Sequence, residues 1–520
     1  MITRLHSASV LGIEGFDVRV EVDVYDASEG GSMTIVGLPD AAVRESTRRV
    51  CTALSNSQFY RTGEMVSIVN LAPADVRKQG PGFDLAIALG LEIAIQQNLE
   101  VPRPLKRKVP TGLEEWCFVG ELALDGQVRG VRGVLPLAVA ARDAGLTRLM
   151  VSPENAEEAA VVEGLQVYAV ENLNDAWAVL LDPAAHLPVQ PDDMLSEVPR
   201  DVDFDEVKGQ PYARRAMEIA AAGGHNLLMC GSPGSGKSML ASRMPTILPP
   251  MTQDESLMAS KIHSVCGLLP RSGGLLRRRP FRAPHHTISD VGLMGGGTNI
   301  SPGEVSLAHH GVLFLDELPE FNRRTLETLR QPLESGVINI ARASGSMQFP
   351  CEFMLLAAMN PCPCGYLGDP RHTCRCRPAD VARYRKKISG PLLDRFDMLI
   401  EVPPVDPASL LNKADGESSA VIRERVVAAR KRQQERYAGT GISCNARLGG
   451  KLLHRWVPLT ESQRKMLLDS VEMLGLSARA FDRILRVTRT IADLAGHEMP
   501  TDDDVFEAIQ YRQFENQLRG

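Results

Sequence analysis

The pattern of apolar and polar positions divides the chain into three blocks. In the first block, residues 1–181, apolar and polar side chains alternate over residues 16–22, as in a half-buried strand. Apolar residues recur at helical spacing over residues 84–95 and 134–144. A segment rich in proline and acidic residues follows and predicts an extended linker over residues 182–202. The first block is therefore expected to form an α/β domain of its own.

The second block, residues 203–403, alternates short apolar strands with helices. Strands are predicted at residues 226–230, 311–315 and 353–358. Short, uniformly apolar strands are typical of a parallel sheet that helices cover on both faces. The third block, residues 404–520, shows helical spacing at 420–437, 460–474, 478–494 and 502–513, and residues 460–463 have the pattern of a capping box. The sequence thus predicts an α/β core followed by a helical C-terminal lid.

A glycine-rich loop between a predicted strand and a predicted helix carries the strongest chemical signal. Its sequence, GSPGSGKS over residues 231–238, matches the phosphate-binding loop of nucleoside triphosphatases. Lys237 is expected to reach the β and γ phosphates, and Ser238 to bind Mg²⁺. A chance glycine turn is a poor alternative, because strand and helix stand where the motif requires them. The expected ATP-binding residues are Val207, Gly209, Gln210, Gly231, Ser232, Pro233, Gly234, Ser235, Gly236, Lys237, Ser238, Met239 and Asp316, with residues 207–210 around the adenine.

Two carboxylates, Asp316 and Glu317, end the predicted strand at residues 311–315. Ligands of open α/β sheets bind at this carboxyl edge. Asp316 is expected to hold Mg²⁺, and Glu317 to orient or deprotonate the attacking water. An apolar run that ends in two acids is weak by itself, because many strands simply meet solvent there. Its place after a phosphate loop makes the catalytic interpretation the stronger one.

Three further polar residues are candidates for catalysis. Asn360 ends the third strand and could hold the attacking water, although it could also be a turn residue before a proline. Arg395 lies where a neighbouring subunit's γ-phosphate is expected, and its alternative is a surface ion pair. Arg479 is the candidate second phosphate sensor, and its alternative is a solvated position on a helix. The expected catalytic set is Glu317, Asn360, Arg395 and Arg479.

Four of the ten cysteines fall within one short segment, in the pattern C-x-C-x₉-C-x-C. They are Cys362, Cys364, Cys374 and Cys376, and His372 lies in the same segment as a possible substitute ligand. Four thiolates suit tetrahedral Zn²⁺, so the segment predicts a structural zinc site. The alternative is a set of reduced, buried cysteines without metal.

The order of these motifs resembles the AAA+ superfamily, its magnesium-chelatase-like branch, and within that branch the bacterial ComM (YifB-like) family. The strings that carry the narrow resemblance lie at residues 279–286, 302–309, 314–321, 360–366 and 389–397. The resemblance implies a hexameric, cytoplasmic ATPase that uses ATP and Mg²⁺ to move on DNA, single-stranded or branched. It further implies branch migration in homologous recombination during natural transformation, with a recombinase as a possible partner.

The first block resembles the Lon-protease-like (ribosomal-S5-like) α/β fold without its catalytic dyad. Residues 78–85 match the loop that carries the Lon nucleophile, but Gly82 occupies the position of the serine. Leu135 stands where the lysine base is expected. Since no acyl-enzyme forms without a hydroxyl and a base, this block is expected to be a non-proteolytic module for assembly or DNA handling.

The overall charge of −6 and the pI near 6.1 give no support for nucleic-acid binding by themselves. A ring can still confine basic residues to its pore. The glycine-rich segment 263–303 and a predicted hairpin at residues 338–348 are candidate pore insertions, because such segments carry arginines that could grip phosphates. The candidate DNA contacts are Arg277, Arg278, Arg279 and Arg342, and Arg282 is a further basic residue of the first segment.

Three alternatives to a DNA motor stay open at this point. A magnesium-chelatase-like motor that remodels a protein partner would have a similar core. A Lon-type protease is disfavoured by Gly82 and Leu135, and a nucleotide-binding scaffold without hydrolysis is disfavoured by the complete catalytic set. The N-terminus lacks a signal-peptide pattern, and no apolar run approaches the ~20 residues that span a bilayer, so a cytosolic location is expected.

Overall fold

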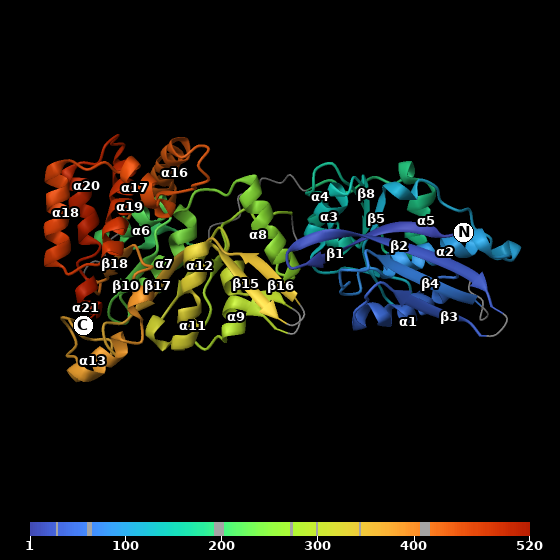
Figure 1. Ribbon diagram of the computed structural model, residues 1–520, viewed down its shortest axis with the longest axis horizontal. Helices are drawn as coiled ribbons and strands as arrows, with labels where there is room; N and C mark the ends of the chain where they lie inside the picture. Colours follow the sequence, from blue (N-terminus) through green and yellow to red (C-terminus); the bar gives the residue numbers. More distant parts are fainter. Residues whose placement is uncertain are drawn as a thin grey trace. The chain divides into compact units, whose positions relative to one another are not determined.

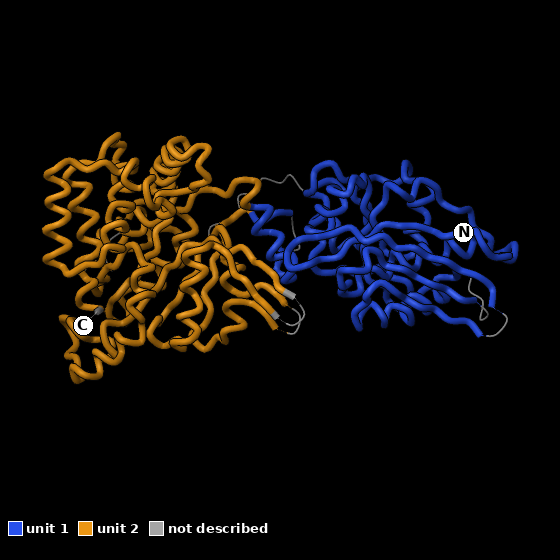
Figure 2. The backbone as a smooth tube through the Cα atoms, in the orientation of Figure 1, with its two compact units in different colours: residues 1–196, 256–276 blue, residues 197–255, 277–520 orange. Residues whose placement is uncertain are grey.

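The computed structural model describes residues 1–27, 30–59, 65–191, 202–270, 274–297, 300–342, 345–405 and 416–519. The chain forms two compact units, shown in different colours in Figure 2. Unit 1 comprises residues 1–196 and 256–276, and unit 2 comprises residues 197–255 and 277–520. Of the linker expected at residues 182–202, residues 192–201 lie outside the described residues.

Unit 1 is built on a seven-stranded mixed sheet in the order β3-β4-β2-β1-β5-β8-β9. The alternation seen in the sequence belongs to β2, whose Val18, Val20 and Val22 are fully buried. The sheet strands are β1 (Thr3–Leu11), β2 (Glu14–Asp26), β3 (Ser32–Val36), β4 (Met65–Ala72), β5 (Trp116–Phe118), β8 (Arg148–Val151) and β9 (Gln166–Ala169), with a separate hairpin of β6 (Glu121–Leu122) and β7 (Val128–Arg129).

The helices of unit 1 are α1 (Ala41–Asn56), α2 (Asp84–Asn98), α3 (Val134–Asp143), α4 (Pro153–Ala160) and α5 (Leu173–Leu181). α2 is apolar around most of its circumference and is buried over nearly its whole length. Such a helix forms the centre of a core rather than its surface. Both helices expected from the spacing, at residues 84–95 and 134–144, are present as α2 and α3.

Unit 2 contains a five-stranded parallel sheet in the order β11-β14-β17-β10-β18, and Figure 1 labels β10, β17 and β18 of this sheet. Its strands are β10 (Leu227–Cys230), β11 (Phe281–Arg282), β14 (Val312–Leu315), β17 (Met354–Met359) and β18 (Met398–Glu401). The three strands predicted from apolar runs are β10, β14 and β17, and every residue in them is buried. Because all five strands run the same way, their carboxyl ends share one edge of the sheet.

Helices and two small hairpins connect the strands of unit 2. The helices are α6 (Pro211–Gly223), α7 (Lys237–Ile247), α9 (Asp290–Met294), α10 (Glu304–Leu307), α11 (Arg323–Thr328), α12 (Arg330–Ser335), α13 (Pro378–Arg385) and α14 (Gly390–Leu393). The hairpins pair β12 (Gly295–Gly296) with β13 (Ser301–Pro302), and β15 (Val337–Arg342) with β16 (Gly345–Pro350). The second hairpin is the one expected at residues 338–348.

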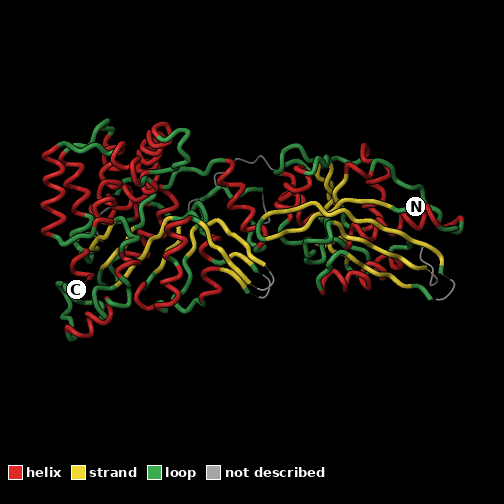
Figure 3. Tube along the Cα trace, viewed as in Figure 1, coloured by secondary structure: helices red, strands yellow, loops and turns green. Residues whose placement is uncertain are grey.

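The C-terminal region of unit 2 is helical, as Figure 3 shows for the part of the chain after β18. Its helices are α16 (Ser419–Arg436), α17 (Gly450–Trp456), α18 (Glu461–Met473), α19 (Ala478–Ala495), α20 (Asp502–Gln510) and α21 (Glu515–Arg519). The capping box expected at α18 is formed by Thr460 and Gln463. None of the helices in the described ranges has the length and apolar character needed to cross a membrane.

The segment 263–303, expected as one pore insertion, is divided in the structure. Residues 256–276, with most of α8 (Gln253–Val265), belong to unit 1. There Lys261 Nζ lies 2.8 Å from Glu14 Oε2, and the Ser264 carbonyl accepts a hydrogen bond from the Gly133 N–H. Phe281 and Arg282 form the edge strand β11 of the core sheet. The expectation of a single insertion was wrong, because residues up to 276 belong to unit 1 whereas residues from 277 onward belong to unit 2.

Candidate functional site

The glycine-rich loop of residues 231–236 joins β10 to the start of α7. Gly234 and Gly236 have φ angles of 77° and 86°, a region that side chains other than glycine rarely adopt. A Cβ at Gly231 would lie 2.3 Å from the Val402 carbonyl oxygen, so this position also requires glycine. The residues therefore form the tight turn that a phosphate-binding loop needs.

Lys237, the first residue of α7, is turned back over this loop. Its Nζ donates to the carbonyl oxygens of Gly231 and Ser232 at 2.7 and 3.0 Å, and lies 3.4 Å from Asn360 Oδ1. Burial lowers the pKa of Lys237, although nearby acidic groups, including Asp316, oppose the shift. A buried ammonium held only by neutral oxygens, with carboxylates close by, fits an anion such as a triphosphate.

Asp316 and Glu317 follow β14 directly. Asp316 Oδ2 accepts a hydrogen bond from Ser238 Oγ at 2.6 Å, and Asp316 Oδ1 accepts one from the Glu317 N–H at 2.9 Å. A hydroxyl and a carboxylate at this separation are oxygen ligands of the kind that Mg²⁺ prefers. The strands β10, β17 and β14 are neighbours, so the structure brings together Lys237, Asn360 and the Asp316–Glu317 pair at one edge.

Gln210 touches the loop from the side of α6. Its Nε2 donates to the Ser235 carbonyl at 2.5 Å and to the Pro403 carbonyl at 3.2 Å, while its Oε1 is buried without a partner among the described residues. Val207 is fully buried, and Gly209 has a φ angle of 64°. Gln210 therefore lies beside the phosphate loop, and the placement of residues 207–210 around the adenine stays a prediction.

His286 is a neighbour of Glu317 that the sequence analysis assigned no role. Its Nδ1 lies 3.4 Å from Glu317 Oε2, and its ring packs against those of His285 and Phe321. Pairing of β11 with β14 brings residues that follow Arg282 beside residues that follow Leu315. The only sequence signal for His286 is its place in the string RPFRAPHH.

Arg395 and Arg479 lie away from this edge. Arg395 is close to the start of β18, and its carbonyl accepts a hydrogen bond from Asn226, which precedes β10. The Arg395 guanidinium is 2.7 Å from Glu334 Oε2, and the Arg479 guanidinium is 3.7 Å from Asp394 Oδ2. Both arginines therefore lie near the amino ends of the strands of the parallel sheet. The phosphate loop lies at the opposite, carboxyl ends of these strands.

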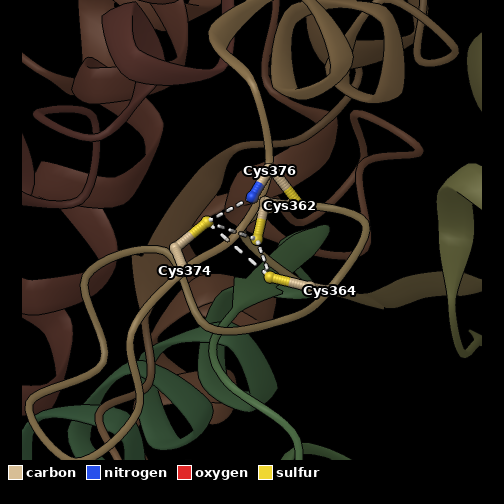
Figure 4. Close-up of side chains that lie close together, drawn as sticks. All are labelled: Cys362, Cys364, Cys374 and Cys376. Carbon is tan, nitrogen blue, oxygen red and sulfur yellow. Dashed lines mark hydrogen bonds between the residues drawn. The ribbon is translucent and has the colours of Figure 1, made fainter.

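The four clustered cysteines come together in the segment between β17 and α13 (Figure 4). Their Sγ atoms all lie within 4.8 Å of one another, and the Sγ atoms of Cys362, Cys364 and Cys374 are 3.4 to 3.7 Å apart. Four thiolates around tetrahedral zinc lie about 3.8 Å apart. Backbone N–H groups, first that of Tyr366, lower the pKa of Cys364 to about 6. The residues therefore fit a Zn²⁺ site, whereas His372 pairs with Asp369.

The candidate DNA contacts differ in their surroundings. Arg277 and Arg278 are exposed. The Arg279 guanidinium is instead bound within the chain. It donates to the carbonyls of Pro249, Pro250 and His310 and pairs with Glu255 at 2.7 Å. Arg282 pairs with Glu304 at 2.6 Å. The expectation that Arg279 grips DNA is therefore corrected to a structural role, and the side chain of Arg342 lies outside the described atoms.

Comparison with protein families agrees with this geometry and defines the class. Residues 203–410 match the family described as magnesium chelatase, subunit ChlI. Residues 20–155 match subunit ChlI of Mg-chelatase, and residues 416–512 match the C-terminal part of magnesium chelatase subunit ChlI. A core with a phosphate-binding loop and these family matches defines a magnesium-chelatase-like AAA+ protein. Membership in this class implies ATP as the bound nucleotide and Mg²⁺ as its metal ion.

Individual relatives narrow the class. The chain is 42% identical over 516 residues to the competence protein ComM of Haemophilus influenzae, covering 98% of this chain and 97% of that one. It is 40% identical to YifB of Salmonella typhimurium, over 99% of this chain and 97% of the relative. The chain belongs to the ComM (YifB-like) family of magnesium-chelatase-like AAA+ proteins. A local match, 25% identical over 228 residues, covers 40% of this chain and 22% of the DNA replication licensing factor Mcm2 of Drosophila melanogaster.

Proposed function

We propose that this protein is an ATP-hydrolysing DNA motor that works as a ring and promotes branch migration. The observation that carries the ATPase part is the convergence of Lys237, Ser238, Asp316 and Asn360 at one edge of the parallel sheet. The motor part rests on family membership, because an AAA+ core of this kind converts hydrolysis into movement of a substrate.

In the proposed reaction, Lys237 binds the β and γ phosphates of ATP and Glu317 orients the attacking water. Ser238 and Asp316 would hold Mg²⁺, which supplies neutralisation of phosphate charge when it is bound. Asn360 would hold the attacking water opposite the γ-phosphate. The short contact between Ser238 and Asp316, 2.6 Å, supports a metal site that is organised before the nucleotide arrives.

The ring is supported by the positions of the arginines. β10 has four residues and spans about 13 Å, so groups at its two ends cannot meet at one phosphate. Arg395 and Arg479 therefore fit the nucleotide of a neighbouring subunit better than that of their own chain. A hexamer is the form that we propose, since six subunits are the assembly that the family resemblance implies.

DNA is proposed as the substrate because the ComM relative is named as a competence protein and Mcm2 as a DNA replication factor. Exposed Arg277 and Arg278 would contact phosphates, and the β15–β16 hairpin would face the pore. Branch migration by this chain would act in homologous recombination during natural transformation, with a recombinase as partner.

We propose four functional segments: a Lon-protease-like domain at 1–181, a linker at 182–202, an ATPase core at 203–403 and a lid at 404–520. In the first, Gly82 and Leu135 replace a nucleophile and a base. A side chain at Gly82 would have room, with Val119 and Val131 no closer than 3.9 Å to a Cβ, so its glycine is not imposed by crowding. Leu135 is fully buried. A non-proteolytic role in assembly or DNA handling fits both residues.

The decisive experiment is branch migration on synthetic three-strand and Holliday junctions, with ATP and with no nucleotide. We expect strand exchange only with ATP, and ATP hydrolysis stimulated by DNA. The Lys237→Ala variant is the matched control and should do neither. Hydrolysis that DNA leaves unchanged, together with intact junctions, would favour the second candidate function: a motor that remodels a protein partner, which the magnesium-chelatase family match supports.

A further inference from the structure

A cavity of about 340 Å³ lies in unit 2 at the opposite edge of the sheet from the phosphate loop. Its lining includes residues at or just before the amino ends of β10, β14, β17 and β18, namely Asn226, Gly311, Met354 and Asp397. Residues of α12, α16 and α19 and of the segment between α16 and α17 also contribute to the lining. The cavity is therefore separate from the phosphate loop of the same chain, although Arg395, proposed to act on a neighbouring subunit's ATP, also lines it.

Six arginines line this cavity: Arg279, Arg395, Arg430, Arg447, Arg483 and Arg486. The carboxylates that line it are Glu255, Glu334, Glu352 and Asp397. Three of the arginines are each paired with one of these carboxylates, as Arg279–Glu255, Arg395–Glu334 and Arg483–Asp397. Positive charge is thus in excess at the cavity wall.

The other three arginines have no carboxylate within ion-pair distance in the described part of the chain. Arg430 donates to the carbonyls of Ala221 and Ala222 at the end of α6. The Nε of Arg486 is buried without a hydrogen-bond partner among the described residues, and so is that of Arg483, a residue nine-tenths buried. Burial lowers the pKa of Arg430 and Arg486. An arginine nevertheless stays charged in a protein, so an anion would relieve the cost of this burial.

Other titratable groups do not supply that anion. His310 lines the cavity, and burial lowers its pKa, which keeps the imidazole neutral near pH 7. Burial raises the pKa of Cys351 to about 12, so its thiol is also uncharged. Among the lining carboxylates, Glu352 forms no ion pair within the described residues, and it cannot balance three arginines.

We propose that this cavity binds a small phosphate anion, inorganic phosphate or pyrophosphate. Guanidinium groups present paired N–H donors that match phosphate oxygens. The aromatic rings of the lining are those of Phe353 and His310, and the His310 ring already packs against His309, so the cavity offers little for stacking a nucleoside base. Its confined volume suits a free anion and excludes a nucleic-acid duplex. The inference does not depend on the proposed DNA motor, since it concerns binding alone.

The test is calorimetric titration with phosphate and with pyrophosphate in the Lys237→Ala background, which removes the phosphate-loop lysine. We expect one anion per chain to bind. Arg447→Gln and Arg486→Gln should each weaken binding about tenfold or more, because each removes a charged hydrogen-bond donor. Arg464→Gln, an exposed position on α18, is the matched control and should leave binding unchanged.

The competing outcomes are distinct. Loss of all phosphate binding in the Lys237→Ala protein would overturn the proposal, since the phosphate loop would then be the only site. Equal binding by the Arg447→Gln protein and its parent would also overturn it. Tighter binding of ADP than of pyrophosphate would overturn the assignment to a free anion. Should Arg486→Gln fail to fold, as judged by its melting curve, the partly exposed Arg447 decides the question.

Discussion

Glu317 adopts a backbone conformation that glutamate seldom takes, with a φ angle of 51°. Such strain at a non-glycine residue is concentrated at functional sites. We predict that Glu317→Gln binds ATP normally, because Ser238 and Asp316 remain, but lowers kcat by about 10²–10⁴-fold. Nucleotide binding and phosphate release measure the two effects. Glu320→Gln, on the same loop, is the control, and normal turnover by Glu317→Gln would refute the assigned role.

His286 lies 3.4 Å from the Glu317 carboxylate, and we propose that it positions this carboxylate. We predict that His286→Ala lowers kcat about tenfold while the KM for ATP stays unchanged, because His286 contacts the carboxylate and not the phosphate loop. His285→Ala is the matched control, since the His285 Nδ1 bonds to Thr287 instead. A rise in KM with unchanged kcat would show that the contact serves nucleotide binding rather than the position of Glu317.

At the scale of elements, the cysteine segment packs on the phosphate loop. A Cβ at Gly365 would lie 2.6 Å from the Pro233 ring, so the two segments touch closely. We predict about one zinc per chain by elemental analysis. Replacing Cys374 and Cys376 with serine should abolish zinc binding and weaken ATP binding, whereas Cys51→Ser, in unit 1, should do neither. Folded, active protein that carries no metal would contradict this prediction.

The sequence predicted those elements whose signals are local. β10, β14 and β17 are short apolar runs flanked by polar or turn residues, and α18 carries its own capping box, so their period and ends are visible in the chain. The two-residue strand β11 has no such signal. The assignment of Lys261 to unit 1 and the position of His286 beside Glu317 depend on tertiary contacts, which no local pattern contains.

At the scale of the whole molecule, one sheet presents two chemically different edges. Its carboxyl edge holds Lys237 and Asp316, and its amino edge holds Arg395, which Glu334 binds within the same chain. In this arrangement, one subunit cannot bring its own Arg395 to the ATP that its own Lys237 binds. Hydrolysis is therefore expected to depend on protein concentration, because the set is completed only where two subunits meet.

Mixing of variants tests this dependence directly. Arg395→Ala should bind ATP normally yet hydrolyse it about 10³-fold more slowly, because the arginine stabilises charge only in the transition state. Lys237→Ala should fail to bind ATP productively. In mixed rings, an intact phosphate loop from the first variant can meet an intact Arg395 from the second, so activity should partly return. Arg383→Ala, an exposed arginine on α13, should neither lose activity nor alter the rescue. If mixed rings are confirmed by mass and remain inactive at every mixing ratio, Arg395 does not act across the subunit boundary.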